Sequence, residues 1–327
     1  MGGRHMKRRR RFFSPVAILL ILLALVSCRP ARRPESGAPE IPSTIARGTR
    51  QEPELKVYIK ETGQIETMPF EEYIAGVVAA EMDPKWPLEA LAAQAILART
   101  FTLEKIAREG GVPHRNAHAS TDIEEFQAYD ASRITDRVRE AVRLTRGKVV
   151  AYNGRYIRAW FHANSGGKTA TAKEGLDFDK EPTPYVISVD DPISLEAAPA
   201  EARAWKATFT KQEITQALKK IGQNPGNFDT VQIVKKSDSG RALTMRIGNA
   251  TISAPAFRLA VGSTKLKSTM IESIKTSGNQ ITFTGRGYGH GVGMSQWGAK
   301  GKAEQGANAE DIIHSYFQGV GIFKIWD

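Results

Sequence analysis

The sequence predicts an α+β fold of mixed helices and mainly antiparallel strands, with two lobes around a cleft. Its 327 residues, 41% of them apolar, are enough for one large domain or two lobes with a sizeable core. Helical and strand-like segments are mixed along the chain without a regular βαβ alternation, which argues against a doubly wound parallel sheet.

The globular pattern begins with Leu55, Val57 and Ile59, whose alternation predicts a strand. Two helices follow over 71–82 and 87–108, separated by the breaker at Asp83 and Pro84. Further helices are expected over 211–221 and 309–317, and further strands over 149–152, 156–161, 185–189, 207–209, 230–234, 242–247 and 281–284.

Residues 1–27 are expected to form a lipoprotein signal peptide. A basic run precedes an apolar stretch, Val16 to Val26, that is too short to span a bilayer comfortably as a helix. The sequence Leu-Val-Ser-Cys that ends at Cys28 resembles the lipobox of bacterial lipoproteins, whose cysteine becomes the lipid-modified first residue. Cys28 is the only cysteine, so it has no internal disulfide partner. An uncleaved membrane anchor is the alternative, and in either case the body of the protein would face outside.

Residues 28–54 are expected to form a flexible tether, because Pro, Gly, Ser and charged residues dominate there. The catalytic domain would then cover 55–327. The formal net charge of +11 is concentrated in the signal segment, which holds six basic residues and no acid. The remainder is too mildly basic to predict nucleic-acid binding, and it would equally suit an anionic envelope.

A glutamate at the end of an apolar helix is the first candidate for chemistry. Glu81 ends the segment that starts at Tyr73, just before the turn at Pro84. Partial desolvation there would raise the pKa of the carboxyl and make it a candidate general acid near neutral pH. A solvated glutamate at a helix C-terminus is the alternative.

The second candidate is a glycine pair after a predicted strand, in the sequence Phe-His-Ala-Asn-Ser-Gly-Gly-Lys-Thr over 161–169. Gly166 and Gly167 would let backbone amides approach a ligand, and the hydroxyl of Ser165 can bond sugar hydroxyls. A tight turn is the alternative explanation.

The third candidate is the most specific: the sequence Gly-Arg-Gly-Tyr-Gly-His-Gly-Val-Gly-Met-Ser-Gln-Trp-Gly-Ala over 285–299. Its alternating glycines predict an unusual backbone that presents polar side chains close together. A nucleotide loop is disfavoured, because no strand-loop-helix with a following acid surrounds it. His290 alone would more often be a structural donor than a catalyst, and we treat it, with Gln296, as lining the cleft.

Together these segments resemble the stage II sporulation protein D family, over roughly Leu55 to the C-terminus. The matching elements are Gly-Val-Val before Glu81, the following Ala-Leu-Ala-Ala-Gln-Ala and Ala-Arg-Thr, the Ser-Gly-Gly element with Lys168 inserted before its Thr, and the closing glycine-rich sequence. Active members are lytic transglycosylases, which implies that Glu81 is the catalytic acid. The implied substrate-binding residues are Arg99, Ser165, Gly166, Gly167, Tyr185, His290, Ser295 and Gln296.

The resemblance implies cleavage of peptidoglycan between N-acetylmuramic acid and N-acetylglucosamine. Ordinary glycosidases need two carboxylates, but a lytic transglycosylase can work with one, because the 6-hydroxyl of the substrate replaces water. No cofactor is expected. Expected partners are peptide-stripped glycan strands, a cell-wall amidase acting upstream, and the outer face of the cytoplasmic membrane through lipid on Cys28. The alternatives are a non-catalytic amidase enhancer and a passive wall-binding lipoprotein, and a role in sporulation is favoured.

Some relatives hold zinc through His and Cys residues before a Gln-x-Tyr element, and this chain departs from them. The stretch here lacks cysteine, although His114, His118 and Asp122 follow at equal intervals and would share one face if it were helical. Pro113 and the polar surroundings favour a loop, so we expect no metal.

Overall fold

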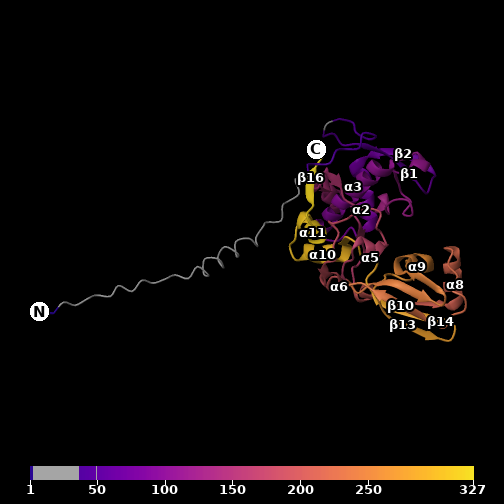
Figure 1. Cartoon of the computed structure of the whole chain (residues 1–327). Coiled ribbons are helices and arrows are strands. Elements are labelled where there is room, and N and C mark those ends of the chain that lie inside the picture. The colour runs from indigo at the N-terminus through magenta and orange to yellow at the C-terminus, as the bar shows by residue number, and fades with distance from the viewer. Residues whose placement is uncertain (3–36, 49) are drawn as a thin grey trace. The chain divides into compact units, whose positions relative to one another are not determined.

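The computed structural model describes residues 1–2, 37–48 and 50–327 of the chain. The predicted signal peptide, Cys28 and the first part of the predicted tether lie outside these residues. Every described helix and strand belongs to the unit Glu35–Asp327 (Figure 1). Among the described residues, no helix combines the length and the apolar character that crossing a membrane requires.

The first lobe is built on two long helices, α2 (Phe70–Glu81) and α3 (Leu88–Glu109). Each begins directly after a proline, and α3 ends at Gly110, whose φ of 75° is the left-handed conformation that favours glycine. Most of α3 is buried, and many of the buried residues are alanines that allow close packing. The helices that pack against it are α4 (Asp136–Leu144), α10 (Gln296–Glu304) and α11 (Ala309–Tyr316).

Small sheets surround these helices. One three-stranded sheet has the spatial order β2 (Gln64–Pro69), β1 (Glu54–Ile59) and β3 (Ala119–Ser120). Another has the order β16 (Gly321–Lys324), β4 (Lys148–Tyr152) and β5 (Arg155–Tyr156). The two-stranded sheets are β6 (Phe161–His162) with β15 (Met294–Ser295), and β7 (Gly167–Lys168) with β8 (Asp190–Asp191). Short helical segments are η1 (Pro113–Arg115), η2 (Ala131–Arg133), α5 (Ala172–Leu176), α6 (Ile193–Glu196) and α7 (Ala200–Arg203).

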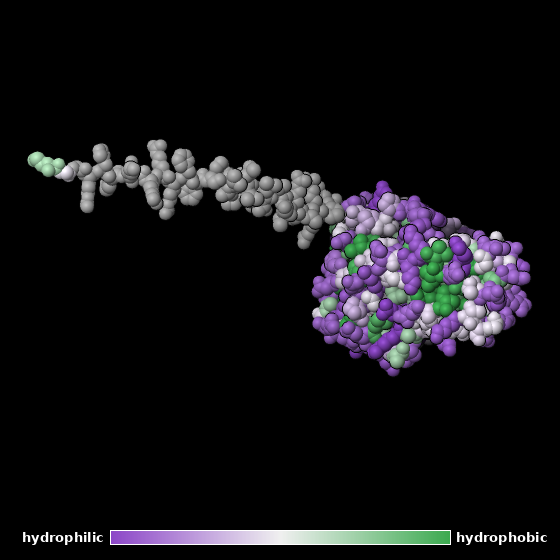
Figure 2. Space-filling view, turned by 60° about the horizontal axis from the view of Figure 1, so that its bottom comes forward, coloured by the Kyte–Doolittle hydropathy of each residue, from purple (hydrophilic) through white to green (hydrophobic). Residues whose placement is uncertain are grey.

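The second lobe has its own hydrophobic core, centred on Phe257 and Phe283. Helices α8 (Lys211–Lys220) and α9 (Ala254–Val261) pack on each other beside its sheets (Figure 1). The lobe has two antiparallel sheets. The first has the spatial order β13 (Ile271–Ser277), β14 (Gln280–Arg286) and β9 (Ala204–Thr210), and the second has the order β10 (Val231–Lys236), β11 (Ala242–Ile247) and β12 (Ala250–Ser253). Figure 2 shows one face of the protein, on which hydrophilic side chains separate several small hydrophobic areas.

A buried arginine joins the two lobes. Arg241, directly before β11, donates from Nη2 to the carbonyl oxygens of Ser165, at 2.6 Å, and Lys168, at 3.1 Å. Its guanidinium lies against Gly291, where a Cβ atom would come within 2.3 Å of Nη2. The glycine-rich sequence therefore lies between the lobes, and glycine is required where the arginine packs on it.

The α+β fold class is confirmed, and so are the predicted helices apart from shifts at their ends. The strand expected over 185–189 is wrong: Tyr185 and Val186 pack against the first core from a loop. The strand expected over 156–161 is also wrong, because its ends belong to two different sheets. In both segments the apolar pattern reflects burial, and strand pairing is limited to a bridge between Val186 and Phe317 and to short pairs at Tyr156 and Phe161.

Candidate active site

Glu81 is the last residue of α2, and as a residue it is half-buried. Oε1 accepts a hydrogen bond from the backbone N–H of Ala128 at 3.1 Å, and Oε2 accepts one from Nε2 of Gln296 at 3.4 Å. Burial raises the pKa of Glu81, and the two hydrogen bonds oppose that rise because they favour the charged form. The net direction is upward, as the sequence predicted for a carboxyl at the end of an apolar helix.

Gln296 reaches Glu81 from 215 positions further along the chain. It is the first residue of α10, which packs on both α3 and α6. Two glycines let α10 pack closely on its neighbours. A Cβ atom at Gly298 would lie 2.0 Å from the hydroxyl of Tyr316 in α11, and one at Gly301 would lie 2.4 Å from Ile193 in α6. The structure thus brings together the opening and closing motifs of the sequence.

The position of the other donor to Glu81, the backbone N–H of Ala128, depends on Gly76 in α2. The ring of Tyr129 lies against this glycine, where a Cβ atom would come within 2.2 Å of it, and stacks on Tyr73 with ring centroids 5.6 Å apart. This packing holds the segment that carries the N–H of Ala128. The glycine of the Gly-Val-Val motif therefore has a structural explanation.

Two tryptophans that the sequence patterns did not single out make a second contact between the opening and closing motifs. Trp86 follows Glu81 in the turn between α2 and α3, and Trp297 follows Gln296 in α10. Their ring centroids are 4.6 Å apart with an interplanar angle of 54°, and both rings are partly exposed. Their places in the same two motifs, with Trp86 five positions after Glu81 and Trp297 directly after Gln296, were the available signal.

The structure places Arg99, expected to bind substrate, in the core, where its side chain is fully buried. Its guanidinium pairs with Glu71, with Nη2 and Oε2 2.7 Å apart, and donates to the carbonyl oxygen of Lys148. Glu71 also accepts hydrogen bonds from the indole of Trp326 and the backbone of Gly147. Arg99 has no surface to offer a substrate, so its place is in the core.

The hydroxyls of Ser165 and Ser295 are also fully buried, contrary to their expected contact with substrate. Ser165 Oγ lies 2.7 Å from the hydroxyl of Ser194, and Ser295 Oγ caps α10 by accepting from the N–H of Gly298. Ser295 Oγ also accepts from the N–H of Ser165. The hydroxyl of Ser295 therefore joins the two motifs, because it accepts hydrogen bonds from the N–H groups of both Ser165 and Gly298.

The glycine pair has the unusual backbone that was expected, with φ of 75° at Gly166 and 98° at Gly167. Gly166 is enclosed, since a Cβ atom there would lie 2.9 Å from the sulfur of Met270. This supports the tight-turn alternative, because the positive φ angles serve a turn that carries β7 toward its partner β8.

His290 and Tyr185 are not in contact with Glu81. Nδ1 of His290 accepts from the N–H of Val292 at 3.0 Å, and burial, with Arg258 and Arg241 nearby, lowers the pKa of His290 to about 3. The imidazole is therefore neutral near pH 7 and carries its proton on Nε2. The hydroxyl of Tyr185 accepts from the N–H of Arg158, and burial raises its pKa to about 12. Tyr185 lines a cavity of about 480 Å³, and Glu81 is not among the residues that line it.

His114, His118 and Asp122, which were weighed as metal ligands, each interact with a different residue. His114 lies 3.0 Å from Glu125, Nδ1 of His118 accepts from the N–H of Lys56, and Asp122 pairs with Lys60. Within residues 37–48 and 50–327, no group of three or more His, Cys, Asp or Glu side chains is placed to hold a metal ion.

Two family models match the chain. The first is described as Stage II sporulation protein and matches residues 58–152, and the second, Domain of unknown function (DUF8618), matches residues 180–293. The first covers α2, α3 and Glu81, and the second covers most of the second lobe and the start of the glycine-rich sequence.

Curated proteins match over most of the chain. Stage II sporulation protein D of Bacillus amyloliquefaciens is 33% identical over 85% of this chain and 83% of its own length. The protein of the same name from Bacillus subtilis (strain 168) is 32% identical over 82% and 78%. Amidase enhancer of Bacillus subtilis (strain 168) is 29% identical over 75% of this chain and 39% of its own length. The chain belongs to the stage II sporulation protein D family.

Proposed function

We propose that the protein is a peptidoglycan lytic transglycosylase with Glu81 as its acid. The environment of Glu81 carries this proposal: the residue is only half-buried, and burial raises the pKa of its carboxyl. A carboxyl with a raised pKa keeps its proton closer to neutral pH, as a general acid must. Burial alone accounts for the rise, with no contribution from another carboxylate among the described residues, which fits chemistry that needs one carboxyl.

In the proposed reaction, Glu81 gives its proton to the glycosidic oxygen between N-acetylmuramic acid and N-acetylglucosamine. The bond from C1 to that oxygen breaks, and N-acetylglucosamine leaves with a free 4-hydroxyl. The Glu81 carboxylate then takes the proton of the 6-hydroxyl as O6 bonds to C1 and closes the 1,6-anhydro ring. Glu81 ends protonated, so no external base is required.

The two N–H donors at Glu81 support this cycle. Ala128 and Gln296 each donate to one carboxylate oxygen, so they stabilise the anion that exists between the two proton transfers. Trp86 and Trp297, which belong to the same two motifs as Glu81 and Gln296, offer partly exposed rings on which the C–H face of a sugar can pack.

The substrate would be cell-wall glycan strands, processed during sporulation. This rests on the two Bacillus relatives named for sporulation and on the one named for amidase enhancement. Strands stripped of stem peptides, and an amidase that strips them, are the proposed substrate and partner. The similarity to an amidase enhancer also supports a second candidate, a protein that promotes an amidase without cutting glycan.

The protein is further proposed to be exported and anchored outside the cytoplasmic membrane by lipid on Cys28. Labelling cells with an alkyne fatty acid tests this directly. The expected result is label on the wild-type chain and none on Cys28→Ser, with both found in extracytoplasmic fractions. Equal labelling of the two chains would contradict lipid attachment at this cysteine.

Digestion of peptide-stripped peptidoglycan by the full chain, with mass spectrometry of the products, tests the cleavage. We expect 1,6-anhydro-N-acetylmuramic ends from the wild type and at least roughly a hundredfold fewer from Glu81→Gln. Glu66→Gln is the matched control, because Glu66 is an exposed carboxylate on β2, and it should cut like the wild type. Folded wild type that releases no anhydro ends would favour the amidase-enhancer candidate, which a mixed assay with an amidase would then check.

A further inference from the structure

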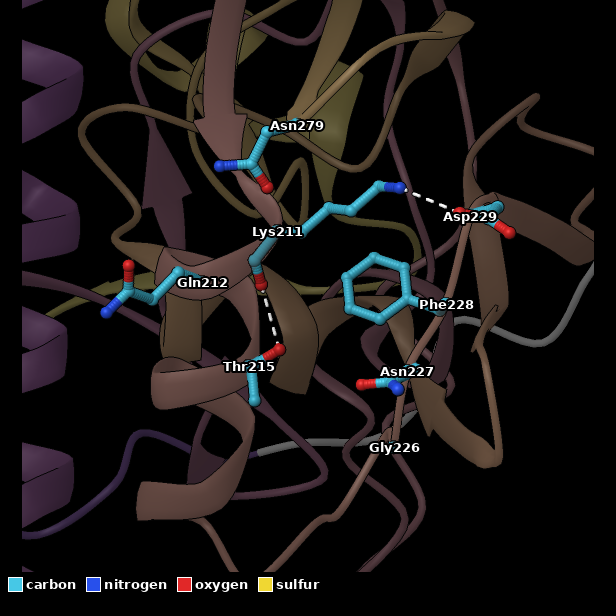
Figure 3. A pocket seen from close by; sticks show the side chains of 8 residues that line it. All are labelled: Lys211, Gln212, Thr215, Gly226, Asn227, Phe228, Asp229 and Asn279. Carbon is cyan, nitrogen blue, oxygen red and sulfur yellow. Dashed lines mark hydrogen bonds and ion pairs between the residues drawn. The ribbon is translucent and has the colours of Figure 1, made fainter.

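The second lobe contains a polar cavity that the proposed cleavage does not use. It has a volume of about 460 Å³ and lies between the first turn of α8, the loop over 226–229 and the turn at Asn279 (Figure 3). The backbone N–H of Lys211 donates to the carbonyl oxygen of Asn279 at 2.9 Å, which ties the turn to the helix. The hydroxyl of Thr215 donates back to the carbonyl oxygen of Lys211. The cavity is therefore preformed, and its volume is in the range of small-molecule sites.

An aromatic ring and three carboxamides line this cavity. The ring of Phe228 lies beside Lys211 and Thr215 (Figure 3), and it is only half-buried because one side packs on the second core. Among the described residues, the carboxamides make no hydrogen bond to another side chain or to the backbone. They belong to Gln212, Asn227 and Asn279. A carboxamide both donates and accepts, as the hydroxyl and acetamido groups of a sugar do.

The charge of the cavity favours a neutral ligand. Lys211 and Asp229 are its only charged lining residues, and they pair with Nζ and Oδ1 2.8 Å apart. The start of α8 is also closed to anions. The hydroxyl of Thr210 accepts from the N–H of Glu213, and the Glu213 carboxylate accepts from the N–H of Thr210. Neither feature offers a free positive group to phosphate or a polyanion.

We propose that this cavity binds one ring of a neutral, N-acetylated saccharide, as a glycan contact separate from Glu81. The C–H face of the sugar packs on the open side of Phe228, and its hydroxyl and acetamido groups bond the three carboxamides. The second lobe then holds a glycan strand while the first lobe acts on it. This binding does not depend on the cleavage chemistry.

Titration of the full chain with chitotetraose, a neutral β-1,4 tetramer of N-acetylglucosamine, tests the proposal. The titration is followed by nuclear magnetic resonance of the ¹⁵N-labelled side-chain amides in the Glu81→Gln background, so that no sugar is consumed. We expect saturable shifts of the amide signals of Gln212, Asn227 and Asn279, which the single variants assign. The double variant Gln212→Ala/Asn279→Ala should raise the Kd read from Asn227 by roughly tenfold or more.

The double variant is suited to the test because both side chains are exposed and make no internal hydrogen bond among the described residues. Gln216→Ala is the matched control: Gln216 is an exposed residue of α8, one turn after Gln212, that lines a different cavity, and its loss should leave the Kd unchanged. An unchanged Kd in the double variant would overturn the proposal. So would the absence of saturable shifts at these signals, or their appearance with a glycerol-phosphate polymer in place of the sugar. Saturable shifts without anhydro products from the wild type would overturn the cleavage proposal alone.

Discussion

At the scale of single residues, Glu81 and Arg99 show how differently two motif residues are used. Glu81 is half-buried and accepts only two hydrogen bonds, so burial raises the pKa of its carboxyl. Arg99 is enclosed by a carboxylate and a carbonyl oxygen, so its guanidinium is fully paired inside the core. The first environment suits proton transfer, and the second suits a structural ion pair.

The raised pKa of Glu81 predicts how Glu81→Gln affects stability. The folded protein binds this proton more tightly than the unfolded chain does, so ionisation of Glu81 costs stability as pH rises through the shifted pKa. Glutamine is neutral at every pH and avoids that cost. We therefore expect Glu81→Gln to gain more free energy of unfolding at pH 7 than at pH 4, measured by urea denaturation. An equal gain at both pH values, or the same trend in the Glu66→Gln control, would contradict a buried carboxyl at Glu81.

The ion pair of Arg99 predicts a large loss on mutation. Arg99→Met leaves the carboxylate of Glu71 without its cationic partner in the core, which costs about 3–5 kcal/mol of unfolding free energy. Glu71→Gln added to Arg99→Met removes the stranded charge and should recover part of this loss. Thermal and urea denaturation measure both. A substrate-binding role would instead show as a higher KM in a protein of unchanged stability.

At the scale of elements, the site forms where the end of α2 meets the beginning of α10. Both elements pack on α3, and glycines let each one approach further neighbours closely: Gly76 of α2 meets Tyr129, and Gly301 of α10 meets Ile193 of α6. Each element also brings a tryptophan, one in the turn after α2 and one in α10. The acid, its amide donor and the aromatic pair are thus fixed by the same helix packing.

The aromatic pair predicts a binding defect without a chemical one. We expect Trp297→Ala to raise the KM for peptide-stripped glycan roughly tenfold with little change in kcat, because it removes a stacking surface worth about 1.4 kcal/mol. Trp297→Phe keeps a ring and should retain most of the affinity. Steady-state release of anhydro ends separates the two constants. A fall in kcat at unchanged KM would show that Trp297 positions Glu81 and does not contact the sugar.

At the scale of the whole molecule, two lobes with separate hydrophobic cores are joined around the glycine-rich sequence. Arg241 of the second lobe bonds backbone carbonyls of the first, and its burial lowers the pKa of its guanidinium to about 10. It therefore remains charged at neutral pH. The proposed saccharide cavity belongs to the second lobe alone, so the lobes can be tested separately by mutation.

The junction predicts that Arg241→Met weakens the whole protein. The substitution leaves the carbonyl oxygens of Ser165 and Lys168 without this donor, at about 1–3 kcal/mol for each buried group. We expect a lower melting temperature and slower release of anhydro ends, because the glycine-rich sequence leads directly to Gln296. Calorimetry and the digestion assay measure these effects. Unchanged stability would mean that the lobes hold together without this contact.

Much of the fold could be predicted because its signals are local. The helices around Glu81 follow from apolar periodicity between proline breaks, and the strands of the second lobe follow from β-branched runs. Helix α10 was missed because Gly298 and Gly301 lower its intrinsic helix propensity. Packing against Tyr316 and Ile193 requires those glycines, and that requirement is invisible in a local window.

The sequence by itself determined the α+β class, the candidate acid and the family, because each depends on residues close together in the chain or on an ordered set of motifs. Only the tertiary structure decided which motif residues face the acid. Burial turned Arg99, Ser165 and Ser295 inward, while Gln296 came to Glu81 across 215 positions and brought Trp297 to Trp86. The physical reason is that a side chain's accessibility and partners are set by long-range packing, which residue type and spacing do not specify.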